Sequence, residues 1–297
     1  MSQRIFVSGA TGVLGRRVVP ALVAAGHEVT ANVRNPHARG AAEAAGAATD
    51  TVDLFDREAT ARLGDAHDAI VHIATSIPTG ASGSRRSGWA MNDRLRSEAA
   101  ANLAAAMAES GGRYVGESIT FPYVDAGDEW INESHPRSYF WGNQTCVDAE
   151  DASTSVTAAG GHGVCLRFAM FFADDSAHVQ MIRSLAKRGI YGPPGRSDAP
   201  TSWIHVDDAA SAVVAALGAA PGSYNVAEPD PTTHGAHAAA LASAVGRTRL
   251  RRLPNPIVKL AGEGLVSLSR AQRISSAALT DATGWKPRRS VIDCWAT

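Results

Sequence analysis

Short apolar runs alternate with longer amphipathic stretches along most of this chain. The apolar runs predict strands at residues 4–8, 28–33, 51–53, 69–73, 113–116, 163–168 and 223–226. Stretches with helical periodicity lie between them, at residues 14–25, 41–45, 93–109, 144–159 and 207–217. Strands separated by helices need right-handed crossovers, which bring the strands into a parallel sheet with helices on both faces. The pattern therefore predicts an α/β protein with a doubly wound parallel sheet of the Rossmann type.

The regular alternation breaks after Phe171, and a Gly-Pro-Pro-Gly segment at residues 192–195 lies within the irregular part. We therefore expect a dinucleotide-binding Rossmann domain at residues 1–168 and 201–227. A smaller, mostly C-terminal substrate-binding cap is expected at residues 169–200 and 228–297. The Gly, Ser and Arg residues between positions 79 and 87 predict a mobile loop.

Composition agrees with a globular enzyme and argues against a nucleic-acid-binding protein. The chain has 297 residues, of which 45% are hydrophobic, enough to bury a large core. Its 28 Lys and Arg residues nearly balance its 29 Asp and Glu residues, and no basic stripe is interleaved with aromatic residues. The arginines between positions 247 and 252 fit a solvated strand edge. Nucleic acid is therefore not an expected partner.

Cysteine usage and hydropathy indicate the compartment. Cys146, Cys165 and Cys294 have neither the spacing of metal ligands nor an even count, which fits a reducing cytoplasm and no metal site. The first apolar run leads straight into a Gly-rich turn, which leaves no room for a signal peptide. No stretch of about 18 apolar residues could span a membrane. We expect a cytoplasmic protein that acts on a small molecule as a monomer or homodimer.

A Gly-rich turn joins the first predicted strand to the first predicted helix, the position at which such a turn binds a dinucleotide. The first Gly permits a tight turn, the second lets the backbone approach a pyrophosphate, and the third lets helix and strand pack closely. Amides at the helix N-terminus then attract the phosphates. The residues expected to bind the cofactor here are Gly9, Thr11, Gly12, Val13, Leu14 and Gly15.

The end of the second predicted strand bears on the choice between NAD and NADP. An acidic residue there would bind the adenosine ribose, but the sequence reads Asn32-Val-Arg34. Arg34 can stack on adenine and donate to a 2′-phosphate, so we expect NADP(H), with NAD(H) as the alternative. Asp53 and Leu54 follow the third strand, where adenine would lie, although Asp53 also fits a simple turn. The expected path of the nicotinamide passes Ala74, Thr75 and Ser76.

Over nearly its whole length the chain carries, in order, GATGVLGRR, VRNP, HIATSIP, ESITFPY, LRFAMFF, SWIHVDDAASAVVAAL, GSYNVAE and ATGWKPR. In this order it resembles the extended and atypical branch of the short-chain dehydrogenase/reductase superfamily, related to NAD-dependent epimerases and dehydratases. The resemblance implies a catalytic helix that carries Tyr-x-x-x-Lys, with a Glu four residues after the Lys. Anchoring on Glu150 places Gly142 at the Tyr position and Cys146 at the Lys position. Both functional groups are therefore expected to be absent.

Other side chains remain candidates for the missing roles. A register shifted by three residues offers Tyr139 as the acid, but Asn143 then stands at the Lys position without a charge to lower a phenol pKa. Cys146 has no flanking His or Lys, so inert packing is favoured over a nucleophile. Ser118 matches the family's carbonyl-binding Ser or Thr, and could either polarise a substrate carbonyl or bond to backbone.

Hydride transfer to a ketone needs a proton for the developing alkoxide, which a neighbouring hydroxyl of the substrate or a bound water could supply. In lacking the Tyr and the Lys, the chain resembles angucyclinone ketoreductases. This resemblance implies NADPH-dependent reduction of an aromatic polyketide in antibiotic biosynthesis. A non-redox isomerase, cyclase or dehydratase and an NADP-sensing regulator are the alternatives. The expected apolar substrate pocket, whose members could equally be core, comprises Phe121, Tyr139, Trp141, Met170, Phe171 and Tyr191.

Overall fold

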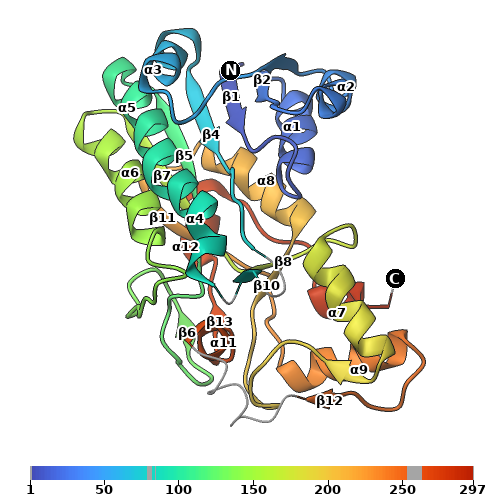
Figure 1. Ribbon diagram of the computed structural model, residues 1–297. Coiled ribbons are helices and arrows are strands. Elements are labelled where there is room, and N and C mark those ends of the chain that lie inside the picture. Colours follow the sequence, from blue (N-terminus) through green and yellow to red (C-terminus); the bar gives the residue numbers. More distant parts are fainter. Residues whose placement is uncertain (1, 79–81, 84, 253–262, 297) are drawn as a thin grey trace.

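The computed structural model describes residues 2–78, 82–83, 85–252 and 263–296. Its central feature is a parallel sheet with the strand order β11-β7-β5-β4-β1-β2-β3, which confirms the doubly wound α/β fold (Figure 1). The strands are β1 (Arg4–Ser8), β2 (Glu28–Asn32), β3 (Ala48–Asp50), β4 (Ala69–His72), β5 (Arg113–Ile119), β7 (His162–Phe168) and β11 (Gly222–Val226). The strand order reverses between β1 and β4, and ligands of such sheets bind outside the carboxyl ends of the strands at this point.

Helices cover both faces of the sheet. On one face α3 (Arg57–Ala66), α5 (Ala100–Ser110) and α6 (Cys146–Ala158) pack together, and on the other α1 (Gly15–Ala24) packs on α8 (Val206–Ala216) (Figure 1). Side chains of β1 alternate between the faces, with Phe6 in one apolar core and Ile5 and Val7 in the other. All three are fully buried, which explains why the strand reads as a continuous apolar run.

Three elements lie at positions that differ from those expected. β3 spans Ala48–Asp50 rather than residues 51–53, because the Asn32 side chain replaces backbone pairing beyond that point. Its amide donates to the Val52 carbonyl (3.1 Å) and its Oδ1 accepts from the Val52 amide (2.9 Å). The helix expected at residues 93–109 begins earlier, as α4 (Arg86–Arg94), and passes through a π-helical turn (Leu95–Ala99) into α5. The short helix expected at 41–45 is η1 (Pro36–Ala38) followed by α2 (Arg39–Ala44).

Some helices lie where the apolar pattern predicted none, namely α3, α7 (Ala177–Lys187) and α9 (His234–Ala244). Each begins at a side-chain cap, in which Asp56, Ser176 or Thr233 accepts a hydrogen bond from a backbone amide of the first turn. Such a cap stabilises a helix start by about 1 kcal/mol. The capping residues were therefore the sequence signal for these helices.

A second, smaller unit lies beyond the carboxyl edge of the sheet (Figure 1). Short parallel pairs join β8 (Met170–Phe172) to β10 (Trp203–His205), β9 (Ile190–Tyr191) to β12 (Arg251–Arg252), and β6 (Trp130–Ile131) to β13 (Arg273–Ile274). Phe172, Trp203 and Trp295 belong to its apolar core, which packs against α7, α9 and α13 (Val291–Cys294). The C-terminal part also contains α11 (Glu263–Leu268) and α12 (Ala277–Thr283).

The remaining expectations concern boundaries, a loop and membranes. The division into residues 1–168 with 201–227 and 169–200 with 228–297 stays a prediction, although β10 pairs with β8 rather than with the main sheet. Residues 79–81 and 84 of the expected mobile loop lie outside the described residues, and residues 86 and 87 belong to α4. Across the described part of the chain, every helix is too short or too polar to cross a bilayer.

Candidate cofactor and substrate site

The Gly-rich turn joins β1 to α1 and touches the segment that follows β4. Gly9 has a φ of +81°, and a Cβ at this position would lie 2.7 Å from the Cα of Ala74. A Cβ on Gly15 would overlap the carbonyl oxygen of Gly9 and push α1 away from the turn. Glycine is required at both positions, because one needs a left-handed backbone and the other a close contact between helix and turn.

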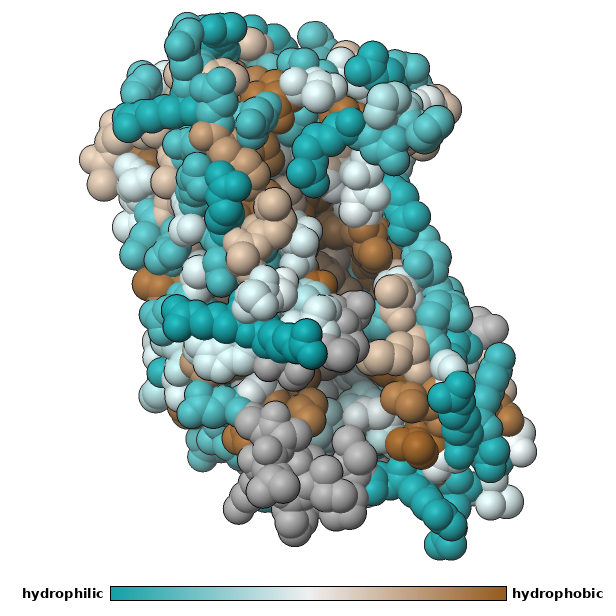
Figure 2. All heavy atoms as spheres, viewed as in Figure 1, coloured by the Kyte–Doolittle hydropathy of each residue, from teal (hydrophilic) through white to brown (hydrophobic). Residues whose placement is uncertain are grey.

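The start of α1 can accept an anion. Among the described residues no side chain caps this helix, and its first turn holds no acidic residue. Thr11 and Gly12 are exposed, Val13 is half-buried and Leu14 is buried. Figure 2, in the orientation of Figure 1, shows the molecule hollowed near its centre, between the sheet and the smaller unit, with apolar side chains in the hollow. An uncapped helix start next to an exposed glycine fits a pyrophosphate, because amides and helix dipole both attract anions.

Arg34 stands exposed just beyond β2 and forms no ion pair with any residue that the structure describes. The last residue of β2 is Asn32 rather than an acidic residue, and its side chain bonds to the Val52 backbone. The Asp53 carboxylate accepts a hydrogen bond from the Phe55 amide (3.0 Å), the turn arrangement that the sequence left open, and Leu54 is buried. An unpaired guanidinium here can bind a 2′-phosphate.

The segment after β4 lies directly beside the Gly-rich turn. Ala74 is half-buried, and Thr75 and Ser76 are exposed. The Ser76 amide donates to Oδ1 of Asn92 in α4 (3.1 Å). Asn92 is fully buried, and its Nδ2 has no hydrogen-bond partner among the described residues. The sequence analysis missed Asn92, whose signal was a polar residue on the buried face of a helix.

Another ring occupies the position expected for the missing Tyr. Gly142 is buried in the turn before α6. A Cβ on Gly142 would lie 2.6 Å from Cε2 and 3.0 Å from Cζ of Phe140. A Tyr side chain could therefore leave the backbone here only if Phe140 moved.

The position expected for the missing Lys contains a buried ionic cluster. Cys146 is fully buried at the start of α6, and the Arg96 guanidinium donates to its Sγ (3.2 Å). Arg96, which the sequence analysis did not single out, also forms a 2.7 Å ion pair with Glu117, and solvent reaches neither side chain appreciably. Burial raises the pKa of the Cys146 thiol to about 11, although the charge of Arg96 opposes this shift. A protonated, buried thiol supports packing rather than a nucleophilic role.

Ser118 lies at the end of β5 and is fully buried. Its hydroxyl donates to Oε1 of Glu150 (3.0 Å). Burial opposes ionisation of Glu150, but hydrogen bonds and positive charge from Arg167 and Arg137 lower its pKa below the usual value. The Ser118 proton is thus engaged by a carboxylate, and the hydroxyl would have to rotate to polarise a substrate carbonyl. Its role in catalysis stays a prediction.

Tyr139 is half-buried on the loop before α6. Solvent does not reach its hydroxyl, which has no hydrogen-bond partner in the described part of the chain. Burial raises the pKa of this phenol, and the Arg137 guanidinium lies 5.5 Å from the ring centroid. The hydroxyl therefore stays protonated at neutral pH and is a potential hydrogen-bond donor. Its assignment as an acid stays a prediction.

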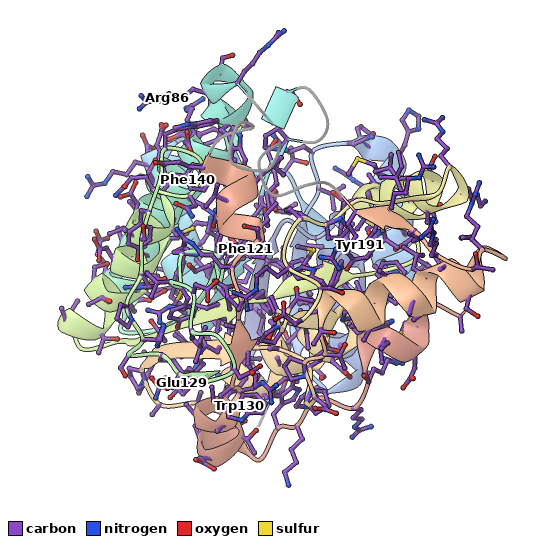
Figure 3. All side chains as sticks on the ribbon, turned by 90° about the horizontal axis from the view of Figure 1, so that it is seen from below. Arg86, Phe121, Glu129, Trp130, Phe140 and Tyr191 are labelled. Carbon is purple, nitrogen blue, oxygen red and sulfur yellow. The ribbon has the colours of Figure 1, made fainter. Side chains whose placement is uncertain are left out.

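The remaining pocket candidates differ in how far they are buried. Phe121, Met170 and Phe171 are half-buried, and Trp141 is 40% exposed. Seen from below, Phe121 lies near the centre of the molecule, with Phe140 and Tyr191 on different sides of it (Figure 3). Tyr191 is fully buried in the core of the smaller unit, which favours the core alternative that the sequence left open for it. The substrate pocket stays a prediction.

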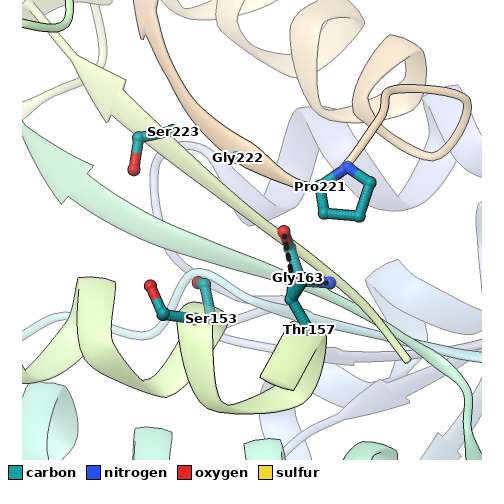
Figure 4. Close-up of a pocket in the computed structure, with 7 residues that line it drawn as sticks. Ser153, Thr157, Gly163, Pro221, Gly222 and Ser223 are labelled. Carbon is teal, nitrogen blue, oxygen red and sulfur yellow. Dashed lines mark hydrogen bonds between the residues drawn. The ribbon is translucent and has the colours of Figure 1, made fainter. Parts of the chain in front are cut away.

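A separate cavity lies at the opposite, amino edge of the sheet. Its lining includes Ser153 and Thr157 of α6 and Gly163, Pro221 and Gly222 near the starts of β7 and β11 (Figure 4). Its volume of about 150 Å³ is small beside the roughly 300–1,000 Å³ of typical small-molecule sites, so we assign it no part in cofactor binding. Within the described ranges, no group of three or more His, Cys, Asp and Glu residues could hold a metal ion.

The parallel sheet, its crevice and the Gly-rich turn define the class: a dinucleotide-binding α/β enzyme. The chain belongs to the NAD dependent epimerase/dehydratase family, whose model matches residues 5–227. Membership confirms the family resemblance and the expectation of a nicotinamide dinucleotide cofactor. The preference for NADP and the loss of the pair at Gly142 and Cys146 stay predictions.

Comparison with individual proteins adds a reductase and two solved structures. The chain is 29% identical over 306 residues to a 3-diazoavenalumate denitrifying reductase from a Streptomyces species, covering 96% of each chain. It is similar to a human epimerase family protein solved with NADPH (TM-score 0.73, 20% identity, 99% of this chain and 98% of the other). It is also similar to UDP-glucose 4-epimerase from Bifidobacterium longum, solved with NAD+ and UDP (TM-score 0.72, 16% identity, 99% and 96%). At these identities the solved structures share the fold with this chain.

Proposed function

We propose that this chain is an NADPH-dependent reductase that transfers hydride to an aromatic substrate without a Tyr–Lys pair. One observation carries the proposal: other side chains of the protein occupy the space at the two positions expected for the Tyr and the Lys. The Phe140 ring packs on Gly142, and the Arg96–Glu117 ion pair packs on Cys146. Neither position has room for the longer side chain unless its neighbour moves. The filled positions favour chemistry that does not need the pair.

The residues present fit a nicotinamide dinucleotide. The turn between Gly9 and Gly15 would hold the pyrophosphate, Arg34 the 2′-phosphate, and the segment around Thr75 would border the nicotinamide. When bound, the reduced nicotinamide supplies a hydride. The task of the chain itself is to hold the acceptor carbon at the carboxyl edge of the sheet and to exclude water from it.

An aromatic polyketide ketone of the angucyclinone type, as in simocyclinone biosynthesis, is the first candidate acceptor. Hydride addition forms a C–H bond and leaves a negative charge on the oxygen, which must take up a proton. A phenol beside the ketone can donate that proton, so the substrate serves as its own acid. Loss of a protein acid typically costs about 10²- to 10⁴-fold in rate, which a well-placed substrate hydroxyl can offset. Phe121, Trp141, Met170 and Phe171 offer apolar surface to such a ligand.

An aryl diazonium is the second candidate acceptor, favoured by the name of the Streptomyces relative, a denitrifying reductase of a diazo compound. Here hydride replaces nitrogen on a ring carbon. One C–H bond forms, the C–N bond breaks, and its electron pair leaves with N₂. The step consumes one hydride and no proton, so a site without an acid is suited to it.

The test is to mix the protein with NADPH and each of three acceptors: a peri-hydroxytetralone, its methyl ether and ortho-hydroxybenzenediazonium. A ketoreductase would oxidise NADPH and add two hydrogens to the hydroxytetralone, and would act far more slowly on the methyl ether. A denitrifying reductase would release N₂ and give phenol from the diazonium. The control for uncatalysed reduction is Gly9→Val, whose side chain would clash with Ala74 and close the cofactor turn.

Two outcomes would replace the proposal. Product formation without net loss of NADPH would identify an isomerase, cyclase or dehydratase that keeps its cofactor. Tight NADPH binding without turnover of any of the three acceptors would favour an NADP-sensing regulator.

A further inference from the structure

Three aromatic rings meet on one flank of the site. Trp89 of α4 and Trp141 of the loop before α6 contact edge to face, with ring centroids 6.3 Å apart and an interplanar angle of 88°. Trp141 meets Phe140 in the same way, at 5.8 Å and 82°. Trp141 keeps 40% of its surface exposed although it has two ring neighbours. The cluster of Trp89, Phe140 and Trp141 therefore has apolar surface that remains exposed after the three rings have packed on one another.

Polar bonds order the backbone next to Phe140 and hold the ring of Trp89. The Phe140 amide donates to Oδ1 of Asn143 (2.8 Å), and the Asn143 amide donates back to the Phe140 carbonyl (3.0 Å). Nε1 of Trp89 donates to the carbonyl of Gly83 (3.0 Å). The rings therefore need little ordering when a ligand arrives, which lowers the entropic cost of binding.

A further bond fixes the two tryptophans relative to each other. The Thr145 hydroxyl, on the loop that carries Trp141, donates to the Asp93 carboxylate of α4 (3.1 Å). This bond joins the two elements from which the tryptophans project. The edge-to-face arrangement therefore does not depend on the ring contact alone.

The cluster borders the expected reaction centre. Phe140 occupies the space of a side chain at Gly142, the position expected for the family's Tyr. Trp89 lies one helical turn before Asn92, which holds the Ser76 amide on the expected path of the nicotinamide. In Figure 3, Phe140 lies between Arg86 at the start of α4 and Phe121 near the centre of the view.

We propose that Trp89, Phe140 and Trp141 form a preorganised stacking subsite for a planar, fused aromatic ring of the substrate. Edge-to-face contacts between the rings leave the exposed surface of Trp141 available, and aromatic surfaces favour offset stacking with a further ring. The ring that replaces the Tyr side chain thus serves substrate binding. This inference deepens the proposed function by assigning residues to recognition of its aromatic substrate.

The test measures binding in the absence of reduction. The probes are naphthalene carboxylate, which is planar, and decalin carboxylate, its saturated analogue. Each is titrated calorimetrically into the full chain saturated with NADP. Trp141→Leu should weaken binding of naphthalene carboxylate about 2- to 10-fold, equivalent to about 0.4–1.4 kcal/mol, and should leave decalin carboxylate nearly unaffected. Trp141→Phe should restore part of the loss.

Trp130→Leu is the matched control, because Trp130 is 51% exposed on β6 and pairs with Arg273 instead of the cluster. It should leave the affinity for both probes unchanged. Equal affinities of the wild-type protein for the planar and saturated probes, or equal effects of the variants at 141 and 130, would overturn the subsite. The measurement requires no turnover, so it tests the stacking subsite independently of the reductase assay. Failure of the subsite and failure of the proposed function can therefore be told apart.

Discussion

The Phe140 ring lies in the space where a side chain on Gly142 would begin, with Cε2 2.6 Å from the position of a Cβ. We therefore expect Gly142→Tyr to leave hydride transfer no faster than in the wild type, because the new side chain must displace Phe140 before it can reach a substrate. The rate of NADPH oxidation by Gly142→Tyr and by Gly142→Tyr with Phe140→Ala tests this. A large gain from the single substitution would show a site that had only lost its acid.

Restoring a Lys at Cys146 should destabilise the fold. The Cys146 sulfur lies 3.2 Å from the Arg96 guanidinium in a fully buried position, so an ammonium there would meet a like charge without solvent. Urea unfolding should show a loss of several kcal/mol for Cys146→Lys and less than about 1.5 kcal/mol for Cys146→Ala. A Cys146→Lys variant as stable as the wild type would mean that the cluster can open to solvent.

Arg34→Ala should weaken the binding of NADPH about 10- to 100-fold and that of NADH only little. The reason is that a charge-assisted hydrogen bond to a 2′-phosphate contributes about 1.5–3 kcal/mol. Binding of both cofactors is measured by fluorescence titration. Arg62→Ala removes a different exposed arginine, paired with Glu58 on α3, and should change neither affinity. Equal losses for NADPH and NADH would remove the basis for the preference for NADP.

The buried ion pair should matter more for stability than an exposed one. Arg96→Met leaves the Glu117 carboxylate without its partner in a site closed to solvent, which should cost about 3–5 kcal/mol of unfolding free energy. Arg62→Met breaks an exposed i,i+4 pair and should cost about 0.5 kcal/mol or less. Similar urea midpoints for the two variants would contradict the burial of Arg96.

Acid should destabilise the smaller unit through its buried histidines. Burial lowers the pKa of His234 to about 3 and that of His237 to about 4, whereas both titrate near 6.5 when unfolded. Above that pH both states are neutral. Below it the unfolded chain binds protons that the native chain does not, so stability falls as pH drops from about 6.5 toward 4.

The pH dependence of urea unfolding tests this, with His237→Asn compared to the exposed control His162→Asn. His237→Asn should flatten the decline by up to about 1.4 kcal/mol per pH unit, and His162→Asn should follow the wild type. Burial raises the pKa of Glu228 to about 8, so this group acts in the opposite direction. Its contribution to the stability of the fold is lost as pH rises from its pKa in the unfolded chain toward 8. All three proteins share that contribution. If the unfolding free energies of His237→Asn and the wild type fell in parallel as pH drops, His237 would not be a cause of the acid destabilisation.

Local patterns were sufficient for the core of the fold. The apolar run of β1, the Gly-rich turn and the amphipathic α1 are neighbours in sequence, and each depends on interactions within a few residues. Helices α3, α7 and α9 went unpredicted although their capping residues were visible in the sequence. The position of β3 was missed because the Asn32 side chain, rather than backbone pairing, holds Val52 beyond the end of the strand.

The sequence by itself determined the parallel sheet and the dinucleotide turn, and it predicted that Gly142 and Cys146 stand at the positions of the family's Tyr and Lys. Only the tertiary structure decided which side chains surround these two residues. Arg96 reaches Cys146 across 50 positions and Ser118 reaches Glu150 across 32. Both contacts depend on how the π-helical turn before α5 and the strand β5 pack against α6. Tyr191 is likewise buried in a core whose other members include residues far from it in sequence. Contacts of this kind depend on the relative placement of whole helices and strands, which periodicity along the chain does not specify.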